Sequence, residues 1–112
     1  MEILESTEGN IQIVKLEGRL DAPNTEKADD FFSKKIVATQ ENIVVDCKNL
    51  DYINSSGLRI LIMGLKNMNK KNLKLILCNL QKNIKDVFHF SGFTNLFNVE
   101  YDFEAAINEA KN

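Results

Sequence analysis

Residues 43–58 read IVVDCKNLDYINSSGL, and this stretch decides the fold class. It opens on a continuous apolar run, Ile43–Val45, which is typical of a strand in the middle of a sheet with both faces covered. It ends in polar residues that lead into an amphipathic segment, Ser56 to about Lys70, whose apolar side chains recur at helical spacing. A buried strand that leads into a long helix predicts an α/β fold with parallel strands.

The rest of the chain alternates strands and helices in the same way. Short strands at residues 3–6 and 11–17, separated by turn residues, predict a β-hairpin at the edge of the sheet. Further strands are expected at 73–78 and 97–101, and further helices from about residue 24 to 36, at 81–90 and at 103–111. The expected order is β-β-α-β-α-β-α-β-α in one α/β domain spanning residues 1–112. The sheet should be mixed but mostly parallel, with one antiparallel strand from the N-terminal hairpin and about four helices.

Local signals at the ends of these elements give further predictions. The apolar alternation shifts its phase between Ile13 and Val14, which indicates either a β-bulge or a strand with both faces covered. Asp21 or Asn24 is expected to cap the first helix. Gly92 is expected to end the third helix as the residue just past its last turn.

The composition excludes several classes of protein. The chain has 112 residues, of which 44% are apolar and 27% charged, values near those of soluble globular domains. No run approaches about 20 apolar residues, so a membrane span is not expected. The first residues, MEILE, are acidic at once and lack the pattern of a secretory signal, so the protein is expected in the cytoplasm. A net charge of −2 with scattered lysines does not favour direct nucleic-acid binding.

Residues that carry metal or acid–base chemistry are scarce. Cys47 and Cys78 are 31 positions apart and form no CxxC pair, so reduced, buried thiols are expected rather than a zinc site. The one histidine, His89, lies among apolar residues and is expected to be a partly packed helix residue rather than a catalytic base. No metal, cofactor or catalytic residue is therefore expected. The same region contains aromatic residues expected in the core or anchoring helices, namely Phe88, Phe90, Phe93 and Phe97, with Phe93 the one to watch as an exposed contact.

The polar residues Asn54–Gly57 at the start of the second helix have several interpretations. Asn and Ser are preferred N-caps, so one of them can satisfy a free N–H of the first turn. A nucleophilic serine is disfavoured because GxSxG and a histidine partner are absent, and there is no P-loop. Alternatively, Ser55 is a substrate: a phosphate there adds about −1.5 to −2 charges at a helix N-terminus, where the free N–H groups favour an anion.

The stretch at 43–58 resembles the signature of bacterial anti-sigma factor antagonists, the STAS domain family. In that family a strand ending in Asp-x-x-x-Leu leads to Asp-Ser-Ser-Gly-Leu at a helix start. Residues 18–22, GRLDA, are similar to the family's Gly-x-Leu-Asp loop, and residues 91–93, SGF, with Phe97 resemble its later Ser-Gly-Leu motif and strand. The resemblance covers essentially the whole chain.

This resemblance implies partner switching. The unphosphorylated antagonist binds an anti-sigma factor that is also a serine/threonine kinase, which releases a sigma factor. The kinase then phosphorylates the antagonist and ends the binding, and a serine phosphatase reverses the modification. The phosphate acceptor maps to Ser55, and Asp21 maps to a loop beside it. The partner-binding positions that the resemblance implies are Asp21, Asn54, Ser55, Ser56, Gly57, Leu58 and Arg59.

Two residues depart from the family pattern. Asn54 replaces the usual Asp, which keeps the size and hydrogen-bonding reach but removes a charge. Arg59 replaces a common Gly and adds a cation one turn from Ser55, where it either holds a phosphate or changes the partner. An alternative function is a non-switching STAS adaptor subunit of a transporter or other regulatory complex. A third is an enzyme or small-ligand sensor, which rests only on the general rule for ligand sites at strand ends.

Overall fold

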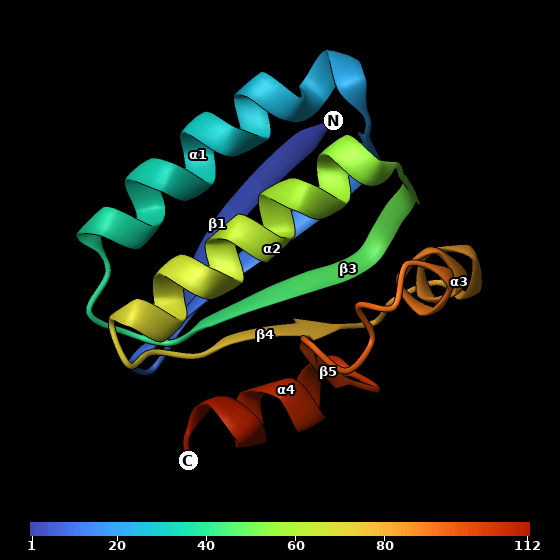
Figure 1. Ribbon diagram of the computed structural model, residues 1–112. Coiled ribbons are helices and arrows are strands. Elements are labelled where there is room, and N and C mark those ends of the chain that lie inside the picture. The colour runs from blue at the N-terminus through green and yellow to red at the C-terminus, as the bar shows by residue number, and fades with distance from the viewer.

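A five-stranded sheet with helices on both faces forms the protein, as the computed structural model shows for residues 1–112 (Figure 1). The strands lie in the order β1-β2-β3-β4-β5 and span Glu2–Glu8, Ile11–Leu20, Ile43–Ile53, Leu75–Cys78 and Asn98–Glu100. The helices are α1, α2, α3 and α4, which span Thr25–Ala38, Ser55–Lys70, Lys82–Phe90 and Phe103–Ala110. Only β1 and β2 pair antiparallel, and the other neighbours are parallel. The predicted α/β fold and element order are confirmed.

Two hydrophobic clusters lie on opposite faces of the sheet. The larger one packs β2, β3 and β4 against α1, α2 and α3, and the smaller one packs the same strands against α4. Figure 1 shows α1 and α2 side by side over one face and α4 against the other. Val44 belongs to the smaller cluster and its neighbours Ile43 and Val45 to the larger, which explains the continuous apolar run in the central strand. None of the helices combines the length and apolarity needed to cross a bilayer.

The phase shift in β2 reflects two covered faces. The β1–β2 register is unbroken, and the consecutive residues Ile13 and Val14 are both buried in clusters on opposite faces. The register shifts lie instead in the β2–β3 pairing, between Lys15 and Glu17 and between Gly18 and Arg19. Beyond these irregularities, β3 continues to pair with β2 through a polar segment and ends at Ile53, well past its apolar start.

The prediction that Asp21 or Asn24 caps α1 is wrong. Neither Asp21 nor Asn24 makes a side-chain capping bond, because a short 3₁₀ helix, Ala22–Asn24, precedes α1 and directs the Asn24 side chain backwards. The Asn24 amide instead donates to the carbonyl of Arg19 at 2.8 Å and to Asp21 Oδ1 at 3.0 Å. These bonds fix the turn that leaves β2.

The end of α3 follows the prediction for Gly92. Its φ is +77°, its N–H donates to His89 O at 3.1 Å, and the N–H of Phe93 donates to Phe88 O at 3.0 Å. This pair of bonds is the Schellman arrangement, which a glycine accommodates without strain.

The aromatic residues near this turn divide between core and surface. Phe88 and Phe97 are buried with ring centroids 5.2 Å apart, whereas Phe93 is only partly buried against the larger cluster. Phe90 is 84% exposed and His89 is exposed, so the expectation of packed side chains is wrong for both. The reason is helical periodicity: α3 turns Phe88 toward the sheet and its next two residues away from it.

Both cysteines are free and buried, as expected. Cys47 belongs to the larger cluster and Cys78 to the smaller, so the two thiols lie on opposite faces of the sheet. Burial, followed by the charge of Asp46, raises the pKa of the Cys78 thiol to about 12, and burial raises the pKa of Cys47 as well. Both thiols are therefore protonated at neutral pH and have little nucleophilic character.

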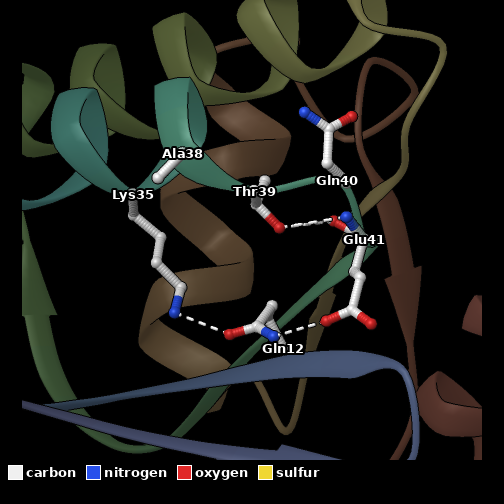
Figure 2. Close-up of a pocket in the computed structure, with 6 residues that line it drawn as sticks. All are labelled: Gln12, Lys35, Ala38, Thr39, Gln40 and Glu41. Atoms are coloured by element: carbon white, nitrogen blue, oxygen red, sulfur yellow. Dashed lines mark hydrogen bonds between the residues drawn. The ribbon is translucent and has the colours of Figure 1, made fainter.

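Polar contacts tie α1 to the sheet at the end where β3 begins (Figure 2). A hollow of about 340 Å³ there is lined mainly by polar side chains, several of which bond one another. The Lys35 ammonium donates to Gln12 Oε1 at 2.7 Å, and Gln12 Nε2 donates to Glu41 Oε1 at 2.6 Å. Lys35 also pairs with Glu5 of β1 at 2.8 Å. The network joins β1, β2, α1 and the loop before β3. The polar residues that line the hollow therefore have a structural role.

Lys71, at the end of α2, binds the carbonyl groups at the last turn of α1. Its ammonium donates to the carbonyls of Ile36 at 2.7 Å, Val37 at 3.3 Å and Thr39. These carbonyls belong to the C-terminal end of α1, where unpaired acceptors and the helix dipole both favour a cation.

We expect Lys71→Met to lower the free energy of unfolding by about 1–3 kcal/mol, since it removes a charged donor from several carbonyls. Lys70→Met is the matched control, because Lys70 is an exposed neighbour without such bonds and should cost less than about 0.5 kcal/mol. Urea unfolding at an unchanged m-value measures both. Equal stability of the two variants would show that the contacts of Lys71 contribute nothing.

Candidate functional site

The candidate site lies where β2 and β3 end and α2 begins. Leu20 pairs with Ile53 at the end of these parallel strands, so the residues that follow, Asp21 and Asn54, leave the sheet at the same edge. The N–H of Asn54 donates to Leu20 O at 3.4 Å and ties the two chain segments together. The carboxyl edge of a parallel sheet is where such folds collect functional residues.

Asn54 is the N-cap of α2. Its backbone is extended, with φ −112° and ψ −175°, and its Oδ1 accepts from the N–H of Gly57 at 3.0 Å. Its carbonyl accepts from the N–H of Leu58 at 2.9 Å. The sequence left open which polar residue caps the helix, and the structure assigns the cap to Asn54.

Ser55 and Ser56 occupy the first two positions of α2 and are both exposed. Neither hydroxyl has a hydrogen-bond partner in the protein, and the backbone N–H groups of both serines are also unpaired. Unpaired N–H groups at a helix start attract anions. Ser55 therefore presents a free hydroxyl in surroundings that stabilise a negative charge.

Gly57 and Leu58, also expected at the docking surface, face inward. A Cβ on Gly57 would lie 2.4 Å from Leu20 O and 2.7 Å from Leu20 Cγ, so no larger residue fits without displacing the end of β2. Leu58 is 2% exposed and belongs to the larger cluster. Both residues position the helix start, and the side chains open to a partner are those of Ser55, Ser56 and Arg59.

Asp21 is held in place by its neighbours. Its side chain is 18% exposed, and its Oδ2 accepts from Arg19 Nε at 3.0 Å. The Arg19 guanidinium also lies 4.1 Å from the ring centroid of Tyr52 on β3. Arg19 and Tyr52 were not predicted as site residues. They are partners across the β2–β3 register, and the bulges in that pairing hide the match in the sequence.

Arg59 lies one helical turn after Ser55 and is exposed. It lines a cleft of about 490 Å³ between α1 and α2, together with Glu26 and Asp29 of α1 and with Ser56. No ion pair joins Arg59 to either carboxylate. No group of three or more His, Cys, Asp and Glu side chains in the structure is arranged to hold a metal ion. The arrangement is suited to recognition by a partner and to modification of an exposed serine.

The chain is similar to known proteins in both sequence and fold. The family model described as STAS domain matches residues 3–109. BtrV of Bordetella bronchiseptica, a candidate anti-sigma factor antagonist, is 32% identical over 94 residues, which cover 84% of this chain and 81% of BtrV.

Two solved structures share the fold at low sequence identity. A candidate anti-sigma factor antagonist of Thermotoga maritima superposes with a TM-score of 0.92 at 12% identity, covering 98% of this chain and 95% of that one. The Bacillus cell fate determinant SpoIIAA in its phosphorylated form superposes with a TM-score of 0.72 at 21% identity, covering 96% of this chain and 98% of SpoIIAA.

We expect Gly57→Ala to destabilise the protein by about 1–3 kcal/mol, because the new methyl group meets the backbone carbonyl of Leu20. Gly64→Ala in the same helix is the matched control. A Cβ there meets only the side-chain ends of Ile36 at 3.4 Å and Leu75 at 3.5 Å, so better helix propensity should stabilise it by up to about 1 kcal/mol. Denaturant unfolding of both variants measures the difference. Equal effects would contradict the close approach of α2 to β2.

Two substitutions of Asn54 distinguish the effect of the capping hydrogen bond from the effect of an added charge. Asn54→Ala should lower the free energy of unfolding by about 0.5–2 kcal/mol, because the N–H of Gly57 loses its acceptor. Asn54→Asp should be at least as stable as the native protein at pH 7, because the carboxylate keeps the acceptor and adds a favourable charge at the helix N-terminus. Thermal unfolding of the two variants tests this, and a loss of similar size in both would remove the capping role.

Proposed function

The chain belongs to the STAS domain family, and from this premise we propose that it is an anti-sigma factor antagonist whose docking surface is switched at Ser55. In its unphosphorylated state it binds an anti-sigma factor with serine/threonine kinase activity, and a sigma factor is released. Phosphorylation of Ser55 by that kinase ends the binding, and a serine phosphatase restores it. The single domain, residues 1–112, acts in the cytoplasm as a binding protein without catalysis or cofactor of its own.

The observation that carries this proposal is the division of roles at the start of α2. Asn54 supplies the capping bond, so the Ser55 hydroxyl is free of any structural duty and exposed. A kinase needs a hydroxyl that it can reach and modify without breaking the fold. SpoIIAA, which shares this fold, has a phosphorylated form, and this supports an equivalent state of the present chain.

The electrostatics of the site explain why phosphorylation would act on binding rather than on folding. A phosphate on Ser55 carries about −1.5 to −2 charges, and the unpaired N–H groups and dipole of α2 stabilise it locally. The capping bond of Asn54 is untouched. A partner that fits the neutral surface must instead accommodate a bulky new anion, which is unfavourable for binding.

Asn54 is compatible with this switch although it departs from the family's Asp. The amide oxygen makes the capping bond that a carboxylate would make, so the helix start is preserved. The missing negative charge also removes one anion from the immediate surroundings of a phosphate on Ser55. The other surface residues expected to contact the partner are Asp21, Ser56 and Arg59.

We expect Ser55→Ala, introduced in the native cells, to retain a small ATP-binding anti-sigma factor of the kinase type. Ser55→Asp should bind the same protein at least about tenfold more weakly, because even one carboxylate adds a negative charge to a surface that the partner fits when it is neutral. Affinity capture followed by mass spectrometry identifies the partner, and calorimetry with the purified pair measures the two affinities.

Ser56→Ala is the matched control, since Ser56 is an exposed serine at the next position of the same helix. Because it removes a hydroxyl without adding a charge, it should weaken binding less than Ser55→Asp does, and it should still gain a phosphate that maps to residue 55. If Ser55→Ala and Ser55→Asp instead retain the same transporter subunit with equal affinity, the chain is a non-switching adaptor. The switch at Ser55 is then rejected.

A further inference from the structure

Arg59 is an exposed cation without a fixed partner. It is the one positively charged side chain among the residues that line the cleft between α1 and α2, and it faces Glu26 and Asp29 of α1. Neither carboxylate lies close enough to form an ion pair with it, although five such pairs occur elsewhere in the structure. The guanidinium is therefore free to pair with a stronger anion nearby.

A phosphate on Ser55 would be such an anion, because Ser55 lies within reach of Arg59 on the same helix. The two residues are four positions apart on α2, so their side chains project from the same face of the helix, about 6 Å apart along its axis. The acidic member would be N-terminal to the basic one, which is the more favourable order for an ion pair on a helix. A phosphate offers oxygens that match the planar fork of a guanidinium.

Most of the other charged groups at this end of the sheet are acidic, and the cation beside them, Arg19, is already paired with Asp21 at 3.0 Å. Asp21 leaves the neighbouring strand at the same edge of the sheet, and Glu26 and Asp29 lie across the cleft. A phosphate placed among these carboxylates is opposed by like charges. Arg59 is the one cation on the same helix within a turn of Ser55, so the local balance of attraction and repulsion depends on it.

We propose that Arg59 is the internal counter-ion of the phosphate on Ser55. On phosphorylation the guanidinium leaves the cleft and pairs with the phosphate on the face of α2. The modification thus changes the surface at two points, since it adds an anion at Ser55 and withdraws the cation from a cleft that keeps Glu26 and Asp29. This inference rests on the proposed function, because it concerns the phosphorylated form of the protein.

The test measures the pKa of the phosphate itself. Protein carrying phosphoserine at position 55, installed during synthesis, is titrated at about 0.15 M salt and followed by ³¹P NMR. We expect Arg59→Ala to raise the second pKa of the phosphate by about 0.3 unit or more, since the dianion loses an ion pair. Arg59→Lys should retain most of the native value because it keeps the charge.

Lys66→Ala is the matched control, since Lys66 is an exposed lysine of the same helix about 16 Å from Ser55 along the axis. Its charge is beyond the screening length at this salt, so its removal should shift the pKa by less than about 0.1 unit. Equal shifts in Arg59→Ala and Lys66→Ala would overturn the proposal, as would no shift in either. Both side chains are exposed, so neither variant should fail to fold.

Affinity measurements separate this inference from the proposed function. If phosphorylation of the native protein leaves binding to the anti-sigma factor unchanged, the proposed function fails, whereas the NMR titration still decides the role of Arg59. If phosphorylation releases the partner but the phosphate pKa is insensitive to Arg59→Ala, the switch stands and the counter-ion is rejected.

Discussion

The close approach of α2 to the end of β2 is the constraint on which the site depends. Gly57 lies beneath the carbonyl of Leu20, and a single methyl group there would enter the space of that oxygen. At this close approach, Asn54 directly before the helix makes the capping bond to Gly57, and the side chain of Leu58 enters the core. The two serines between these anchored positions are left at the surface.

Structural and functional roles are thereby divided among adjacent residues. The cap and the buried glycine hold the backbone, and the exposed serines hold nothing in place. A charge added to Ser55 then changes the surface that a partner meets, while the hydrogen bonds of the helix start persist. The carboxylates of Glu26 and Asp29 and the cation of Arg59 set the field in which that charge would act.

The hairpin, the central strand and the helix at residues 55–70 were predictable because each produces a local hydrophobic pattern. Predictions failed where a neighbouring turn redirected a side chain. Asn24 stands at the N-cap position of α1 but makes no capping bond, because its amide bonds back to Arg19 and Asp21 in the turn that leaves β2. Phe90 is exposed because it falls on the face of α3 opposite Phe88, and helical periodicity already places the two on opposite faces.

The sequence by itself determined the order of strands and helices, the polar helix start at Asn54–Gly57 and Ser55 as a candidate acceptor, because short-range patterns encode these features. Only the tertiary structure decided that Asn54 makes the cap and that Arg59 shares a cleft with Glu26 and Asp29. The cap is a local bond, but the sequence offers several polar residues that could make it, and the backbone geometry at the helix start selects one. The cleft depends on segments about 30 residues apart in the chain, which meet only after β2 and β3 pair and α1 packs beside α2.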